Sequence, residues 1–326
     1  MRIKTVFKYL AGAIICLLFL VVTAWLIWVP SARGPGYVFI AEWGERGTLP
    51  GQFIDPTGIA VTGNEVFVSD ARNARIQVFD LEGNFTRQFG GKGDGPGELG
   101  RPMNLSIMND EIFVADYWND RIQVYALDGT PRRIIGQAGP GTGEFNSPGG
   151  VAVGPDGDLF VADFYNQRIQ HLQADGEFIE QWGETGEVGI RAGEFNYPTD
   201  VAITTDGTLY VADGYNDRVQ MFSSTGQFLR KWGGPFAINI KGPFNGWFTT
   251  VSSIAIGPAA NVFVTDFYNN RIQKFSADGA FLSTFGTKGD GPGQFDRPLG
   301  VAVATDGSVF VADFGNHRIQ KWRLKR

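Results

Sequence analysis

The sequence predicts an all-β protein, a six-bladed β-propeller with four-stranded antiparallel blades, preceded by one transmembrane helix. Three observations support this fold class. A phrase of the form V-x-D-x-x-N-x-R-[IV]-Q occurs six times, first as "VSDARNARIQ" from Val68. Successive copies begin 46, 47, 50, 53 and 47 residues apart, a period typical of propeller blades and some solenoids. An uncharged apolar segment of 21 residues precedes the first copy.

The apolar segment covers residues 9–29. As a helix it would reach about 31 Å, enough to cross a hydrocarbon core of about 30 Å. Basic residues precede it, so the positive-inside rule places the N-terminus in the cytoplasm and the rest on the extracytoplasmic side, periplasmic or extracellular. A cleaved signal peptide is the alternative. We expect residues 1–35 to form a cytoplasmic stub, a transmembrane signal-anchor and a linker, and residues 36–326 the propeller.

Each repeat contains four short runs with the composition of β-strands. In the third repeat these runs are residues 151–153, 159–163, 168–172 and 178–182. Pro155-Asp156-Gly157 and Asp175-Gly176 stand between them and are signals for hairpin turns. Four short antiparallel strands per repeat predict a propeller blade.

The two ends of the repeat array predict how the ring closes. The last repeat stops after its third strand, in "RIQKWRLKR". The strand expected at Tyr37–Trp43 stands alone and matches the fourth strands of other repeats, such as "EFIEQWG". We therefore expect it to pair with Arg318–Trp322 as the outer strand of the last blade, which leaves no free sheet edge.

The repeated phrase closely resembles NHL repeats, a family of six-bladed propellers. In the third repeat the resemblance is carried by Asp163, Asn166, Arg168, Ile169 and Gln170, and by the preceding "GEFNSPGGVAV". It covers the whole chain outside the apolar segment. The resemblance implies a module that binds a protein, peptide or small-molecule ligand on its loop face. Some similar propellers are enzymes, which implies the alternative of a metal-dependent lyase or a lactonase-type hydrolase.

An Asp ends the second strand of each repeat and an Arg opens the third, so the two face each other across a hairpin. The pairs are Asp70/Arg75, Asp116/Arg121, Asp163/Arg168, Asp213/Arg218, Asp266/Arg271 and Asp313/Arg318. An active site needs one copy of a constellation in one place. We therefore interpret the six pairs as structural, with a catalytic triplet as the alternative.

Composition bears on cofactors and partners. The formal net charge of −6 disfavours a nucleic-acid partner. The single Cys16 excludes an intrachain disulfide, and His171 and His317 lie in different repeats, which gives poor support for a zinc site. We predict no catalytic residue, metal ligand or cofactor, with a divalent cation such as calcium in the pore as the alternative.

Function is expected where the repeats differ. Asn104, Asp200 and Ser253 stand where other repeats have glycine, at the start of the pore-lining strand. The connection from Gly233 to Gly246 is six residues longer than most and is apolar, so it either contacts a ligand or covers its own blade. We predict a ligand site at the pore mouth formed by Asn104, Asp200, Ser253, Phe244 and Trp247.

Aromatic pairs recur in the loops that carry the repeated phrase: Tyr117-Trp118, Phe164-Tyr165 and Phe267-Tyr268. Packing between blades is the favoured interpretation, because aromatic residues dominate β cores. An exposed aromatic ring is the alternative. The function predicted from the sequence is a membrane-anchored, extracytoplasmic NHL-repeat propeller that binds a protein, peptide or other ligand. The alternative is a divalent-metal-dependent lyase or lactonase-type hydrolase with its site at the pore.

Overall fold

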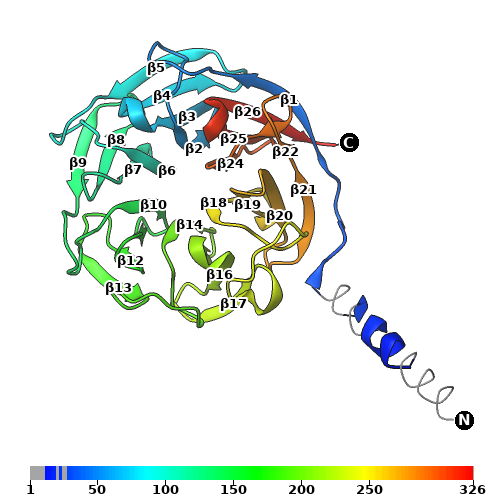
Figure 1. The fold of residues 1–326 in the computed structure, drawn as a ribbon. Helices are drawn as coiled ribbons and strands as arrows, with labels where there is room; N and C mark the ends of the chain where they lie inside the picture. The colour runs from blue at the N-terminus through cyan, green and yellow to red at the C-terminus, as the bar shows by residue number, and fades with distance from the viewer. Residues whose placement is uncertain (1–11, 20–21, 24–27, 326) are drawn as a thin grey trace, which may run out of the picture.

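The hairpin turns of each repeat fold the chain into one antiparallel sheet, and the sheets stand around a central axis (Figure 1). The computed structural model describes residues 12–19, 22–23 and 28–325. Within residues 28–325 there are six four-stranded sheets, each with its first strand at the pore and its fourth at the rim. The prediction of a six-bladed, all-β propeller is therefore confirmed.

The sheets follow the repeats along the chain. Blades 1 and 2 contain β2 (Pro56–Thr62), β3 (Glu65–Asp70), β4 (Arg75–Asp80), β5 (Phe85–Gly90), β6 (Pro102–Met108), β7 (Glu111–Asp116), β8 (Arg121–Ala126) and β9 (Pro131–Ile135). Blades 3 and 4 contain β10 (Pro148–Val153), β11 (Leu159–Asp163), β12 (Arg168–Leu172), β13 (Phe178–Trp182), β14 (Pro198–Ile203), β15 (Leu209–Asp213), β16 (Arg218–Phe222) and β17 (Phe228–Trp232). Blades 5 and 6 contain β18 (Val251–Ile256), β19 (Val262–Asp266), β20 (Arg271–Phe275), β21 (Phe281–Phe285), β24 (Val301–Val303), β25 (Val309–Asp313), β26 (Arg318–Leu324) and β1 (Tyr37–Trp43). Loops and connections contain the short turns η1 (Ala71–Asn73), η2 (Gly214–Asn216), η3 (Pro235–Ala237), η4 (Pro258–Ala260) and η5 (Phe314–Asn316), and the parallel pair β22 (Thr287–Lys288) and β23 (Gln294–Phe295).

The ring closes through strands from opposite ends of the chain. β1 pairs antiparallel with β26, from Tyr37 opposite Leu324 to Trp43 opposite Ile319. The sheet order is β1-β26-β25-β24, so the N-terminal strand is the outer strand of the last blade (Figure 1). This pairing, which the orphan fourth strand predicted, removes the free edge of β26.

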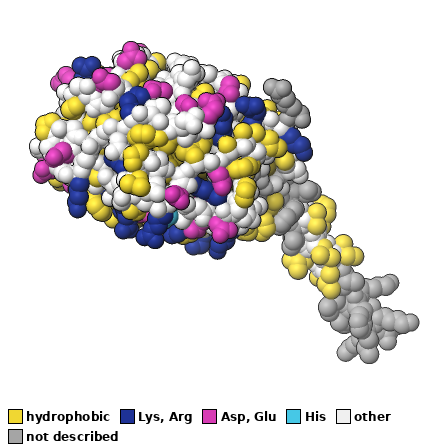
Figure 2. Space-filling view, turned by 90° about the horizontal axis from the view of Figure 1, so that it is seen from above, with side chains coloured by type: hydrophobic (Ala, Val, Ile, Leu, Met, Phe, Trp, Pro, Cys, Tyr) yellow, Lys and Arg dark blue, Asp and Glu magenta, His cyan; other side chains and the backbone are white. Residues whose placement is uncertain are grey.

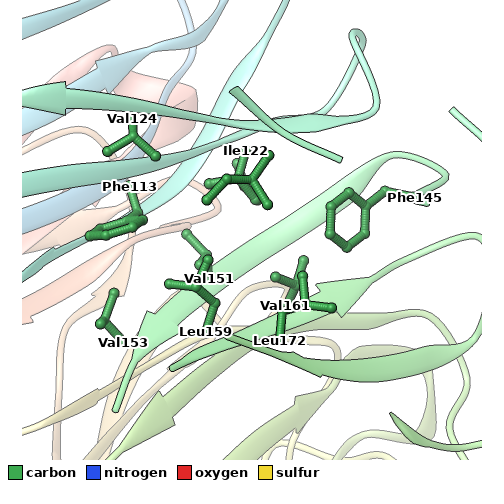
Figure 3. Close-up of a cluster of buried hydrophobic side chains, with 11 residues drawn as sticks. Phe113, Ile122, Val124, Phe145, Val151, Val153, Leu159, Val161 and Leu172 are labelled. Atoms are coloured by element: carbon green, nitrogen blue, oxygen red, sulfur yellow. The ribbon is translucent and has the colours of Figure 1, made fainter. Parts of the chain in front are cut away.

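The hydrophobic core lies between neighbouring blades. Between blades 2 and 3, Phe113 and Ile122 face Val151 and Leu159, and Phe145 from the connection closes the cluster at one end (Figure 3). These side chains are 0–3% exposed, and burying a side chain of this size contributes about 1.5–3 kcal/mol. Each blade is therefore stabilised mainly by its two neighbours.

The prediction of a transmembrane helix at residues 9–29 is wrong. No helix among the described residues is long and apolar enough to cross a bilayer. The described helix at residues 12–19 would reach only about 12 Å, against a hydrocarbon core of about 30 Å. Because no described helix could cross a bilayer, the predicted single-pass membrane topology is also wrong. Residues 9–11, 20–21 and 24–27 of the predicted segment lie outside the described residues.

The helical residues before the propeller point away from it. Figure 2 views the propeller from its side and shows hydrophobic side chains exposed on this projection. Ile15 and Phe19 are among the most exposed apolar side chains of the described part of the chain. Further along, the backbone N–H groups of Arg33 and Gly34 both donate to Leu282 O of β21.

Candidate functional site

The repeated Asp and Arg side chains meet as the sequence predicts. In all six blades Arg Nε donates to Asp Oδ2, over distances of 2.7–3.3 Å. In blade 4 the side chains of Asp213 and Arg218 are both 0% exposed. The same Asp213 Oδ2 accepts a hydrogen bond from Asn216 Nδ2 (2.9 Å) and from Gln220 Nε2 (3.0 Å). The four recurring residues form such a buried polar network in five blades. In blade 2 Gln123 Nε2 instead donates to Val124 O and Arg133 O.

This network holds the connection between blades in place. Asp213 Oδ1 accepts the backbone N–H of Asn196 (2.8 Å), and Arg218 Nη2 donates to Arg191 O (2.9 Å) and Glu194 O (2.8 Å). All three partners lie in the irregular connection from β13 to β14. A connection without regular structure leaves backbone groups that need partners. The geometry therefore supports a structural role for the six pairs.

A second recurring hydrogen bond, which the sequence reasoning missed, links the blades at five of the six junctions. The residue before each repeated Arg has positive φ, and in five repeats its side chain accepts a backbone N–H at the start of the following blade. The bonds join Ser147 N to Asp120 Oδ1 (2.6 Å), Tyr197 N to Gln167 Oε1 (2.6 Å), Thr250 N to Asp217 Oδ1 (2.6 Å), Arg297 N to Asn270 Oδ1 (2.8 Å) and Asp55 N to His317 Nδ1 (3.2 Å). The sequence signal for this bond was the residue between the Asn and the Arg of the repeat, which carries a side-chain acceptor in five of the six copies.

The junction between blades 1 and 2 lacks this hydrogen bond. Ala74 stands at the acceptor position and has no side-chain acceptor. Instead, Asp116 Oδ1 accepts the N–H groups of both Gly100 (2.8 Å) and Arg101 (3.1 Å). At the other five junctions the residue whose N–H is held has positive φ, whereas Arg101 does not. The backbone at Arg101 therefore differs from its counterparts.

Three of the predicted site residues come together in the wall of the pore. Asp200 Oδ2 accepts hydrogen bonds from Ser253 Oγ (2.8 Å) and from the N–H of Ile254 (3.0 Å), and the Asn104 side chain acts to lower the pKa of the Asp200 carboxyl. Burial raises the pKa of Asp200 to about 7, although these hydrogen bonds act to lower it. The cluster lines a pore cavity of about 260 Å³.

Close packing against the following blade explains the glycines at this level of the pore. A Cβ added at Gly150 would lie 2.2 Å from Asp200 Oδ1, and one at Gly58 would lie 2.7 Å from Asn104 Cα. Such distances are far below van der Waals contact, so neither Gly58 nor Gly150 leaves room for a side chain against the following blade.

Phe244 and Trp247 belong to a different cluster, at the base of the N-terminal segment. Their rings are 5.0 Å apart, and Trp247 Nε1 donates to Trp28 O. In the same connection, Phe236 lies 4.8 Å from the Trp28 ring, and Asn245 Nδ2 donates to Pro30 O (3.1 Å). The long apolar connection therefore has an intramolecular partner, an arrangement that neither sequence interpretation included.

The loop face, which carries the second-to-third strand loops and the connections between blades, presents a cluster of aromatic rings. Its members come from blades 2, 3 and 4, and we call them the aromatic surface: Tyr117, Trp118, Phe164, Tyr165, Tyr197 and Tyr215. Ring centroids of neighbours are 4.9 Å apart for Phe164 and Tyr197, 5.1 Å for Tyr197 and Tyr215, and 6.0 Å for Tyr117 and Phe164. In each loop pair the first ring packs between blades and the second is exposed, so both sequence interpretations hold in part.

The repeats match a known family. The sequence model of the NHL repeat matches residues 53–79, 145–172, 195–222 and 295–322. These ranges cover the end of the preceding connection and the first three strands of blades 1, 3, 4 and 6. The chain belongs to the NHL-repeat propeller family. Two curated relatives match over 52 residues: the B-box type zinc finger protein ncl-1 of Caenorhabditis elegans at 46% identity and Protein brain tumor of Drosophila melanogaster at 44%. The match covers 16% of this chain and only 6% and 5% of theirs.

Solved structures share the fold of this NHL propeller. A protein of unknown function from Bacteroides thetaiotaomicron aligns with a TM-score of 0.67 at 16% identity, over 90% of this chain and 76% of that one. Virginiamycin B lyase from Staphylococcus aureus aligns with a TM-score of 0.58 at 17% identity, over 89% of this chain and all of the other. Identities this low show a common fold alone.

The closing junction of this NHL propeller predicts a pH effect. His317 Nδ1 accepts the N–H of Asp55, which requires the neutral imidazole. Burial lowers the pKa of His317, with Arg46 and Arg297 acting the same way and Asp55 and Asp70 opposing them. A lowered folded-state pKa contributes stability above the unfolded value of about 6.5 that is lost as pH falls through the folded-state pKa.

We expect the melting temperature of the wild type to fall more between pH 7.5 and pH 5 than that of His317→Gln, because glutamine accepts the same bond at both pH values, as Gln167 does in blade 3. Thermal unfolding followed by circular dichroism at the two pH values measures the difference. Parallel pH profiles for the two proteins would contradict the assignment.

Proposed function

We propose that this NHL propeller is a binding module for a protein or peptide, and that the ligand lies on the loop face over the aromatic surface. The observation that carries the proposal is the exposure of large rings in one place: Trp118 is 56% exposed, Tyr165 47% and Tyr215 51%. Contiguous exposed apolar surface on a folded domain marks interaction sites. Tyr, Trp and Arg are also the residues enriched in the energetic centres of interfaces.

The geometry next to the aromatic surface supports the same place. A mainly apolar cleft of about 160 Å³ lies at the pore mouth and is lined by residues of all blades but the first, including Asn104, Tyr117, Phe164 and Leu299. A concave apolar site with few polar groups is the usual form of a ligand pocket. Asn104 thus stays in the proposed site. Trp247 is hydrogen-bonded to Trp28 and Phe244 packs against Trp247, so both are left out.

We do not propose the alternative of an enzyme that works in the pore. Asp200 is the carboxylate among the residues lining the described pore cavity, and its Oδ2 is held by Ser253 and Ile254. These bonds link blade 4 to blade 5, so we assign Asp200 and Ser253 to the support of the pore wall. The described residues contain no group of three or more His, Cys, Asp and Glu side chains that could hold a metal ion.

The test is a selection from a displayed peptide library against the full chain. We expect the selected peptides to bind at least tenfold more weakly to the triple variant Trp118→Ala, Tyr165→Ala, Tyr215→Ala, because Trp and Tyr are enriched among the interface residues whose truncation costs about 2 kcal/mol or more. The matched control replaces three exposed apolar residues of the outer strands, Ile134, Ile179 and Leu229, by Ala. Peptides that bind the triple variant and the control equally well would contradict the proposed site.

A further inference from the structure

The guanidinium of Arg101 at the pore mouth has no anionic partner in the described structure. Its Nε–H is buried and has no hydrogen-bond acceptor. Its guanidinium carbon lies 5.5 Å from the Trp118 ring centroid and 6.0 Å from that of Tyr117, so aromatic faces rather than a carboxylate hold it. By contrast, Arg297, the counterpart of Arg101 in the last blade, forms an ion pair with Asp296 (3.1 Å).

This arrangement follows from the symmetry break between blades 1 and 2. With Ala74 in place of a side-chain acceptor, Arg101 N–H is bound by Asp116 instead. Arg101 does not have the positive φ of its counterparts at the five other junctions. Its side chain therefore leaves the backbone in a different direction from the side chains of those counterparts. A single departure from the repeat thereby places one cation in the wall of the apolar cleft.

The dimensions of the cleft limit what can enter it. Its volume is about 160 Å³, and an apolar cavity of about 150 Å³ in another protein binds benzene. The walls include the rings of Tyr117 and Phe164 and the side chains of Met103 and Leu299, which suit a flat apolar group. The cleft therefore has room for one aromatic side chain.

We propose that Arg101 selects ligands in which a carboxylate adjoins an aromatic side chain. The ring of the ligand enters the cleft between Tyr117 and Phe164, and its carboxylate receives two parallel N–H bonds from the guanidinium. A single guanidinium matches one carboxylate in geometry and charge. The bond also forms beside aromatic faces that exclude water, where charge-assisted hydrogen bonds are stronger than in bulk solvent. This inference rests on the proposed function and names its ligand chemistry.

The probes are N-acetylphenylalanine and its amide, which differ only in the carboxylate. Ligand-observed NMR titration of the full chain gives both dissociation constants. We expect the wild type to bind the acid at least fivefold more tightly than the amide. We expect Arg101→Gln to bring this ratio to about one, while Arg297→Gln, which removes the same charge elsewhere on the loop face, leaves it unchanged. Equal melting temperatures of the two variants check that folding is intact.

Three results would overturn the inference: equal binding of acid and amide by the wild type, a ratio that survives Arg101→Gln, or no binding of either compound. Failure of the proposed function is distinct from these. If the proposed function fails, library peptides will bind equally well with and without Trp118, Tyr165 and Tyr215. If only this inference fails, peptide affinity will fall when those rings are removed but will not change with Arg101→Gln.

Discussion

Replacing Asp213 by alanine is expected to lower the free energy of unfolding by about 3–5 kcal/mol, because it leaves a buried guanidinium without its counter-charge. Arg218 Nε lies 2.7 Å from Asp213 Oδ2, and neither side chain is exposed. The substitution also removes the acceptor for Asn196 N–H and for Asn216 Nδ2. Each unmade bond at a buried donor adds to the loss.

Urea unfolding of the full chain, followed by circular dichroism, measures this loss as a lower midpoint at unchanged slope. The matched control is Asp278→Ala, whose partner Arg230 is 3.7 Å away with the two side chains 70% and 55% exposed. Exposed pairs contribute at most about 1 kcal/mol. A variant of Asp213 no less stable than the control, or one that loses ligand binding at unchanged stability, would contradict a structural role for the pair.

Deleting residues 37–43 is expected to abolish the folded monomer, since it removes the strand that closes the ring. β1 covers the edge of β26 and contributes Tyr37, Phe39 and Trp43 to the outer core, where Tyr37 lies 4.8 Å from the Phe285 ring and Phe39 lies 6.0 Å from that of Trp322. Burial of one aromatic ring contributes on the order of 2 kcal/mol, and a whole domain typically has a stability of only about 5–15 kcal/mol. The uncovered edge would also template aggregation.

Size-exclusion chromatography with light scattering, together with a thermal melt, tests this expectation. The control keeps the strand and replaces its two exposed apolar residues, Val38 and Ile40, by threonine, which preserves the β-sheet preference. We expect the control to remain monomeric with a melting temperature close to that of the wild type. A monomeric deletion variant that melts like the wild type would refute the closure of the ring by β1.

The strands and their closure could be predicted because the signals are local. Pro155-Asp156-Gly157 specifies a turn wherever it occurs, and a blade repeated six times supplies six independent copies of the same evidence. The lone strand at Tyr37–Trp43 could be placed because it resembles the fourth strands and the last repeat lacks one. The transmembrane prediction failed because it relied on the hydropathy of residues 9–29, and the described helix is too short to span a bilayer.

By itself, then, the sequence determined the all-β repeat, the number of blades, the facing Asp and Arg side chains and the direction of closure. Only the tertiary structure decided what neighbouring blades bring together: the hydrogen bonds of Asp200 to the next blade, the contact of the long connection with Trp28, and the rings around Arg101. The physical reason is distance along the chain. Turn and strand preferences act over a few residues, whereas Tyr117, Phe164 and Tyr197 meet only because a closed ring fixes where each blade places its loops.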